Sequence, residues 1–264
     1  MNACLEKLGQ EIYTSNARFA VELLQNADDN YYDGVVPYFA FFITPNYVLT
    51  KNNEVGLSRE NVKALCNVNK STKRGKQNFI GKKGIGFKSV FKVTDTPHIL
   101  SSQYTFKFDR NGPLAYIVPE WIPDETLENI KKKVNTKLND GSTHIYLPLR
   151  PDHDFDPEEL YNNIDFLPIF LRKIRKLEID YTDAKNNRNS KFVELVTLND
   201  PIWQITIKKN NEETQNVEFI VFRDVFDVDK TFSKGYETGE RTEIVLAFPK
   251  EIMKCQVYAY LPVS

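Results

Sequence analysis

Residues 79–92 read FIGKKGIGFKSVFK, in which three glycines and four lysines are set among apolar residues. The glycines occupy positions 81, 84 and 86, and the apolar residues that follow have the spacing of a helix. Glycine permits positive φ angles and lets backbone amides approach a ligand closely. Because amides at the start of a helix bind anions, the stretch predicts a site for a polyphosphate.

Basic residues surround these glycines, and no acidic residue lies between positions 70 and 92. The order of the glycines, GxxGxG, differs from the dinucleotide fingerprint GxGxxG, and no GK[ST] follows at P-loop spacing. Taken alone, the stretch is also compatible with a glycine-rich turn whose lysines are solvated. The basic residues are Lys70, Lys73, Arg74, Lys76, Lys82, Lys83, Lys88 and Lys92.

A second candidate feature lies upstream, in residues 15–30, SNARFAVELLQNADDN. Its apolar residues recur at helical spacing, while Glu22, Asn26 and Asp29 project together from the other side. A carboxylate at Glu22 can deprotonate a water molecule, and the amide oxygen of Asn26 can bind Mg²⁺. The alternative is an ordinary exposed helix face. The combination with the glycine stretch favours a nucleotide site.

Composition restricts the possible partners and compartments. The 264 residues include 35 basic and 36 acidic side chains, so no global field attracts nucleic acid or a membrane. Three scattered cysteines predict neither disulfides nor zinc, and the pattern contains no apolar segment of transmembrane length. We expect a cytoplasmic or nuclear protein. The last residues, VYAYLPVS, have a strand pattern, which suggests a fragment of a longer protein.

The chain is expected to divide near residues 150–159, RPDHDFDPEE, where prolines and acids interrupt regular structure. Residues 1–150 carry the two candidate features, and within them residues 37–51, PYFAFFITPNYVLTK, predict two β segments broken at Pro45-Asn46. Residues 151–264 predict a helix over 164–176 and then six β-like runs, the last of them QVYAYLP.

Several separated motifs resemble one known superfamily. ELLQNADDN, STKRGKQNFIGKKGIGFKSVF and DGSTHIYLPL are similar, in this order, to the ATP-binding domain of gyrase, the ninety-kilodalton heat-shock chaperone, histidine kinases and MutL, the GHKL superfamily. Within it, the chain looks most like the NO VEIN and sacsin-type branch. The resemblance is dense over residues 11–149 and thin beyond them.

The resemblance implies a fold and a set of functional residues. The fold would be a Bergerat two-layer α/β sandwich that binds ATP under a mobile lid, followed by a smaller, mostly β region. Glu22 would be the general base and Asn26 the Mg²⁺ ligand, with Asp29 on the nucleotide side of the same helix. The other residues implied in ATP binding are Asn52, Lys73, Gly81, Lys83, Gly84, Ile85, Gly86, Phe87 and Thr143.

One departure from the superfamily pattern affects the base-binding end. Where DxGxG is usual, this chain has NNEVG, with Asn52 at the aspartate position and Glu54 at the first glycine. An asparagine oxygen can still accept a hydrogen bond from the adenine amino group, but it is uncharged. The exchange puts adenine selectivity in question.

Three functions from different classes are compatible with these residues. The favoured one is a Mg²⁺-dependent ATPase module, slow in isolation, whose lid closure controls a chaperone-like or regulatory protein with possible homodimerisation and protein clients. The second is a nucleotide-sensing or structural interaction domain with little or no turnover. The third, a histidine-kinase-type phosphotransferase, ranks last because no hairpin with an acceptor histidine is visible. A cation that completes the site could come from Arg172, Lys173, Arg175 or Lys176.

Overall fold

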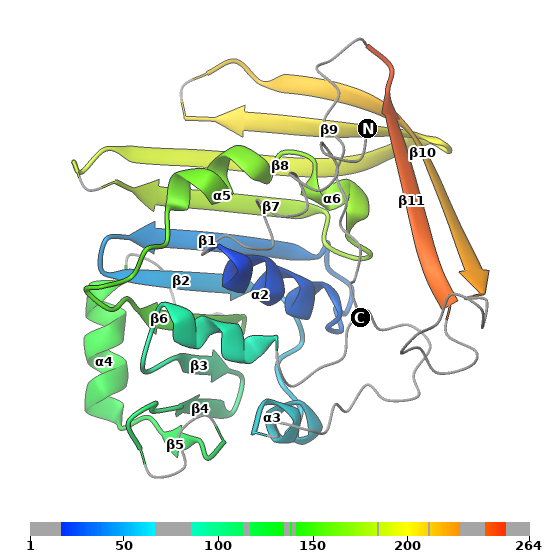
Figure 1. Ribbon diagram of the computed structural model, residues 1–264. Coiled ribbons are helices and arrows are strands. Elements are labelled where there is room, and N and C mark those ends of the chain that lie inside the picture. Colours follow the sequence, from blue (N-terminus) through cyan, green and yellow to red (C-terminus); the bar gives the residue numbers. More distant parts are fainter. Residues whose placement is uncertain are drawn as a thin grey trace.

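The computed structural model describes residues 17–66, 86–112, 117–134, 138, 141–183, 185–210, 212–227 and 241–251. Their strands form one eleven-stranded sheet (Figure 1). The neighbouring strands described pair antiparallel, except that β1 and β7 run parallel. From edge to edge the order is β11 (Arg241–Pro249), β10 (Gln215–Asp227), β9 (Ile202–Lys209), β8 (Arg188–Asn199), β7 (Lys176–Thr182), β1 (Tyr38–Thr44), β2 (Tyr47–Asn52), β6 (Thr143–Pro148), β3 (His98–Ser101), β4 (Tyr104–Lys107) and β5 (Glu120–Trp121).

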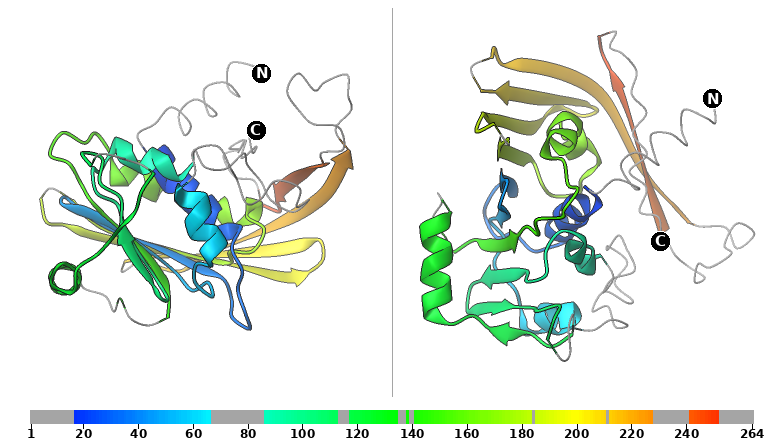
Figure 2. Two further views of the ribbon diagram at one scale, coloured as in Figure 1. Left: turned by 90° about the horizontal axis from the view of Figure 1, so that it is seen from below. Right: turned by 60° about the vertical axis from the view of Figure 1, so that its left-hand side comes forward.

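Helices cover parts of both faces of this sheet. The main apolar core lies beneath α2 (Arg18–Asp28) and the 3-10 helix η1 (Phe87–Lys92), where Val48 of β2 points toward the helices. Leu49, the next residue, points to the opposite face and packs under α4 (Asp124–Lys133), as alternation along a strand requires. Figure 2 shows α4 on the far side of the sheet from α2. The helices are α2 (Arg18–Asp28), α3 (Arg59–Cys66), the 3-10 helix η1 (Phe87–Lys92), α4 (Asp124–Lys133), α5 (Pro157–Asn163) and α6 (Leu167–Phe170).

The structure confirms the helix and the hairpin predicted at the start of the described chain. In α2 the buried residues follow the predicted apolar stripe, from Phe19 to Leu23 and Ala27. Strands β1 and β2 are joined by a two-residue turn at positions 45–46, and the hydroxyl of Thr44 accepts a hydrogen bond from the Tyr47 N–H at 3.1 Å. These two elements form the base on which the candidate site is built.

The predicted fold class is wrong. The chain does not form a two-layer α/β sandwich followed by a separate β region; it forms a single large, mostly antiparallel sheet. Residues 176–182 pair in parallel with β1 from Tyr38↔Lys176 to Ile43↔Tyr181, and β8 to β11 extend the sheet from there. A strand edge exposes unpaired backbone groups, and here β7 satisfies those of β1. The boundary near residue 150 falls between β6 and α5 and stays a prediction.

The predicted helix over 164–176 is mostly wrong. Only residues 167–170 are helical, and Leu171 already has extended φ and ψ angles of −79° and 152°. The backbone N–H groups of residues 172–174 donate to the carboxylate of Asp28 instead of continuing a helix. A tertiary contact has therefore overridden the local helical pattern. The run QVYAYLP, residues 256–262, lies outside the described residues.

Candidate functional site

The floor of a pocket is formed by side chains that face α2 from three adjacent strands. Phe39 of β1 lies opposite Asn52 of β2, and Asn52 lies opposite Thr143 of β6. Two residues along, Thr50 pairs with Ile145. Because side chains alternate between faces, both rows point into the same space, and all five residues line the pocket.

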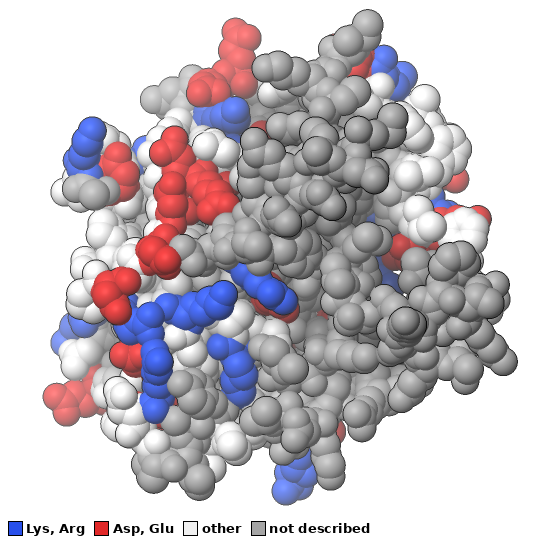
Figure 3. All heavy atoms as spheres, in the orientation of Figure 1, with Lys and Arg blue, Asp and Glu red and all other residues white. Residues whose placement is uncertain are grey.

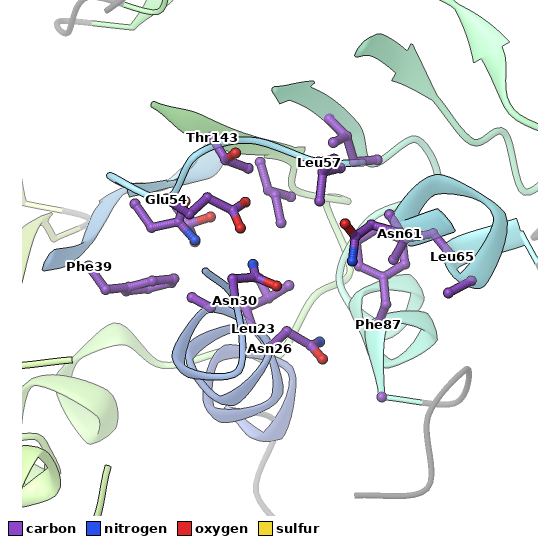
Figure 4. A pocket seen from close by; sticks show the side chains of 17 residues that line it. Leu23, Asn26, Asn30, Phe39, Glu54, Leu57, Asn61, Leu65, Phe87 and Thr143 are labelled. Atoms are coloured by element: carbon purple, nitrogen blue, oxygen red, sulfur yellow. The ribbon is translucent and has the colours of Figure 1, made fainter. Parts of the chain in front are cut away.

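Helix α2 supplies a second wall. Leu23, Asn26 and Ala27 of the helix line the pocket from one side, and Asn30, two residues beyond the end of the helix, lines it as well. Figure 4 shows Asn26 and Asn30 across the pocket from Thr143 and Glu54. The helix and the segment that follows it therefore present two amides toward the floor of the pocket.

Residues around α3 and η1 close the remaining side. Ser58 caps the start of α3, since its hydroxyl accepts from the N–H of Asn61 at 3.2 Å. The space between these elements amounts to about 910 Å³, a volume that includes open solvent at the mouth of the pocket. The lining residues of this side are Leu57, Asn61, Ala64, Leu65, Gly86 and Phe87, with Ile99 of β3 below them.

Two polar groups at the floor are placed to contact a ligand. The side-chain oxygen of Asn52 is buried and has no hydrogen-bond partner in the described part of the chain. The Thr143 and Ser101 hydroxyl oxygens lie 2.6 Å apart, and that of Ser101 also accepts from the Leu57 N–H at 2.8 Å. If Ser101 donates to Thr143, the Thr143 hydroxyl hydrogen can point into the pocket. The floor thus offers an amide acceptor beside a hydroxyl.

A carboxylate also lies in this pocket. Glu54 is only 4% exposed and lines the cavity, with its side chain directed inward (Figure 4). Burial, and then the charge of Glu54, raise the pKa of the Tyr32 phenol well above its usual range. The Tyr32 hydroxyl donates to the Ala27 carbonyl at 2.9 Å. The sequence motif predicted Glu54 only as the replacement of a glycine, and its position in the pocket was not predicted.

Glu22, the predicted general base, lies beside the pocket and is not one of its lining residues. A Cβ atom added to Gly86 would lie 2.4 Å from the Oε2 atom of Glu22, so the carboxylate rests against the glycine. Its other oxygen is 3.7 Å from the Arg18 guanidinium, one helical turn away. The carboxylate therefore stands next to the end of the glycine stretch, at the border between α2 and η1.

Neither of the two adjacent aspartates at the end of α2 is among the residues that line the pocket. Asp29, predicted to face the nucleotide, is 6% exposed, and its carbonyl accepts from the Lys173 ammonium at 3.1 Å. Asp28 accepts three backbone hydrogen bonds of 2.8 Å each from residues 172–174. A carboxylate with three such donors ties α2 to the segment before β7.

Apart from Asp29, the predicted site residues fall into two groups. Asn26, Asn52, Gly86, Phe87 and Thr143 line one pocket, with Glu22 at its side. The other predicted residues, Lys73, Gly81, Lys83, Gly84 and Ile85, lie outside the described residues, so the phosphate-binding stretch stays a prediction. Asn30 and Asn61 were missed. Asn30 could have been found, because it follows Asn26 by one helical turn.

The four basic residues suggested as the completing cation all have structural partners. The Arg172 guanidinium lies 3.3 Å from Glu243, and the Lys176 ammonium lies 3.1 Å from Glu194. Lys173 contacts the carbonyls at the end of α2, and Arg175 donates to the carbonyls of residues 172 and 174. Burial and the neighbouring Arg223 lower the pKa of Arg175. These side chains hold the segment before β7 in place.

The amide of Asn26 is the predicted metal ligand that the structure describes. Within the described ranges, no three His, Cys, Asp or Glu residues form a cluster that could hold a metal ion. The amide oxygen of Asn26 lies in the pocket wall, and one protein oxygen together with substrate phosphates and water is a common Mg²⁺ environment. The residue present therefore fits a Mg²⁺ ion that arrives with a phosphate ligand.

Charges are mixed on the face of the molecule seen in Figure 3, where acidic and basic side chains lie close together. This agrees with the nearly balanced composition. In the described part of the chain, every helix is too short or too polar to cross a membrane.

Comparisons with known proteins identify related sequences. Residues 43–162 match the family described as the Sacsin domain. The chain is 42% identical over 157 residues to Protein NO VEIN of Arabidopsis thaliana, a match that covers 57% of this chain and 6% of that protein. It is 27% identical over 148 residues to Sacsin of Homo sapiens, covering 50% of this chain and 3% of that protein. The chain thus spans less than a tenth of either relative. The domain match and the two relatives show that this part of the chain is similar to sacsin and NO VEIN proteins.

Proposed function

We propose that the pocket between α2 and the sheet binds a nucleotide, with ATP or ADP and Mg²⁺ as ligands. One observation carries the proposal: residues predicted from separate motifs, Asn26, Asn52, Gly86 and Thr143, come from different elements and line the same cavity. An unrelated set of exposed polar residues has no reason to converge in this way. The relationship to the wider GHKL superfamily stays a prediction.

In this proposal the two ends of the pocket have different tasks. Asn52 and Thr143 contact the base, because the unpartnered oxygen of Asn52 needs a donor from a ligand. Asn26 holds Mg²⁺ against the phosphates. Glu22, beside Gly86, orients a water molecule for attack on the terminal phosphate, which is the step that makes the module an ATPase.

A nucleotide-sensing module with little or no turnover is the second candidate. It is favoured by the position of Glu22, which contacts Arg18 and is not part of the pocket lining. In either case, a role in a chaperone-like or regulatory protein, lid closure, homodimerisation and protein clients are proposals about the whole protein, of which this chain matches only a small share.

Binding and turnover can be tested separately. The proposal expects millimolar ATP and ADP with Mg²⁺ to raise the melting temperature, and Asn26→Ala to remove the Mg²⁺-dependent part of the shift. Glu22→Gln should bind ATP like wild type but release no phosphate, whereas Glu125→Gln, an exposed control in α4, should behave like wild type. No shift with any nucleotide would refute the proposal. Binding with equal phosphate release from wild type and Glu22→Gln would remove Glu22 from its role.

A further inference from the structure

We propose that Asn61 is a further ligand-binding residue of this pocket, with its side-chain NH₂ group donating a hydrogen bond to a phosphate oxygen of the ligand. The inference rests on the proposed nucleotide-binding function and adds a residue that the sequence motifs did not indicate. It follows from the way in which the start of α3 orients this one amide.

Asn61 and Ser58 exchange two hydrogen bonds at the start of α3. The Ser58 hydroxyl accepts from the Asn61 N–H at 3.2 Å, and the Asn61 side-chain oxygen accepts from the Ser58 N–H at 2.9 Å. This is the arrangement of a capping box, with asparagine in the place of the more usual glutamate or glutamine. Because a backbone N–H can only donate, the amide atom that it contacts is the oxygen, and the other atom is the NH₂ nitrogen.

The NH₂ group of Asn61 is available to a ligand. The bond from Ser58 is the one side-chain hydrogen bond of Asn61 within the described ranges, so neither NH₂ hydrogen has an acceptor there. The residue is half-buried and lines the pocket, with its amide directed toward the cavity (Figure 4). Turning the amide over would lose the bond from Ser58. Asn61 therefore presents a donor, and not an acceptor, to the ligand.

Asn61 lies away from the base end of the pocket. That end is formed by Asn52 and Thr143 on neighbouring strands, whereas Asn61 lies beside Phe87 (Figure 4). The other described lining residues on its side carry no polar side-chain group; they are Leu57, Ala64, Leu65, Gly86 and Phe87. Asn61 is thus the polar side chain of this wall in the described part of the chain, and it meets the part of the ligand beyond the base.

A phosphate oxygen is the acceptor that fits this position best. Beyond its base, a nucleotide offers ribose hydroxyls and phosphate oxygens as acceptors. Only the phosphates are ionised, and a hydrogen bond to an ionised acceptor is roughly twice as strong as one between neutral groups. Gly86, on the same side of the pocket, ends the glycine stretch that the sequence predicts to bind phosphate. The NH₂ group of Asn61 and the Mg²⁺ ion proposed at Asn26 would then hold the phosphates together.

Two substitutions separate a ligand contact from a role in folding. Asn61→Asp removes the donor but keeps the acceptor for the Ser58 N–H, so its melting temperature without ligand should stay close to that of wild type. Asn61→Ala removes both and adds no charge. Calorimetry with ADP and Mg²⁺ should show binding about tenfold weaker for Asn61→Ala, and at least as weak for Asn61→Asp. Asn46→Ala, an exposed control in the turn between β1 and β2, should bind like wild type.

Two results with these variants would overturn the inference. If Asn61→Ala binds ADP as tightly as wild type, the NH₂ group makes no contact with the ligand, and a loss confined to Asn61→Asp is repulsion by the new charge. If Asn61→Ala loses affinity while Asn61→Asp does not, only the capping of α3 matters. In both cases wild type still binds ADP, so the proposed function stands.

Changing the ligand identifies the part that Asn61 contacts. The loss in Asn61→Ala should be the same for ADP, inosine diphosphate and 2′,3′-dideoxy-ADP, since these compounds differ in the base or the ribose and share the phosphates. A loss that disappears with either analogue would place the contact on the base or the ribose and refute the inference. If wild type binds none of these nucleotides, the proposed function is refuted, and this inference falls with it.

Discussion

Asp28 allows the strongest test of how the two halves of the chain are held together. Its carboxylate accepts hydrogen bonds from the backbone N–H groups of Arg172, Lys173 and Ile174, each at 2.8 Å. Asp28 is 4% exposed, and Ile174 is fully buried. Replacing Asp28 with Asn keeps the shape of the side chain but removes the charge, and it turns an NH₂ group toward at least one of these donors.

The expected cost follows from these contacts. A hydrogen bond to a charged group contributes roughly 1.5–3 kcal/mol. One oxygen of Asp28 accepts from both Lys173 and Ile174, and the other accepts from Arg172, so asparagine can keep its oxygen on the first two donors while its NH₂ group faces the Arg172 N–H. Two hydrogen bonds then lose a charged acceptor, and the third is replaced by a contact between two donors. We therefore expect Asp28→Asn to lower the free energy of unfolding by about 3 kcal/mol, close to the cost of one lost bond to a charged group and the weakening of two others.

Chemical denaturation and thermal unfolding measure this effect. A loss of about 3 kcal/mol corresponds to a fall in melting temperature on the order of 10 °C for a chain of this size. Asp33→Asn is the matched control, because it removes the same charge from an exposed position five residues away and should change stability by less than about 0.5 kcal/mol. If the two variants are equally stable, the three short hydrogen bonds do not hold the halves together, and the reasoning fails.

Three further perturbations have defined outcomes. Gly86→Ala places a methyl group 2.4 Å from the Glu22 carboxylate, so the carboxylate must move, and phosphate release should fall while far-UV circular dichroism stays unchanged. Burial lowers the pKa of His98 from 6.5 to about 4. The unfolded chain therefore binds a proton at His98 more readily than the folded chain, so the folded state is fully stable above pH 6.5 and loses stability as the pH falls toward 4. Urea titrations should show a loss of about 3 kcal/mol over that window, which His98→Gln should remove. Lys191 is fully buried and pairs with Asp165, whose side chain is 22% exposed. Replacing Lys191 with Ala removes this partner and leaves a cavity, so urea denaturation should show a loss of about 2–3 kcal/mol, below the cost of breaking a fully buried ion pair; a loss below 1 kcal/mol would contradict this.

Local patterns predicted individual elements well and their assembly poorly. The stripe of α2 and the turn between β1 and β2 depend on residues close in sequence, and both were found. The pairing of β1 with β7 joins residues more than 130 positions apart, from Tyr38 to Lys176, and no local pattern encodes it. For this reason the fold class was predicted wrongly although most of its strands were anticipated.

The candidate site shows the same division between local and distant information. Asn26 and Thr143 were predicted from motifs, and both line the pocket. Asp28 and Asp29 are adjacent acids with the same local context, and the sequence could not indicate that Asp28 binds the backbone of residues 172–174. Glu54 was missed as a pocket residue because it lies two residues after the end of β2, and the sequence does not indicate that this end of the strand is buried in the pocket. The sequence indicated the chemical types of these side chains, but it did not indicate which of them are buried.

The dependence of the site on the second half of the chain leads to a last prediction. Asn26 is positioned by α2, and α2 is tied through Asp28 to the segment that begins β7. The core beneath it also contains Leu177 and Ile179 from beyond residue 150. A fragment of residues 1–150 would expose this apolar surface and the open edge of β1, so we expect it to unfold without a cooperative transition and to bind no nucleotide. If the fragment instead unfolds cooperatively with the ligand affinity of the whole chain, residues 1–150 are an independent domain, and the shared sheet contributes little to holding α2 in place.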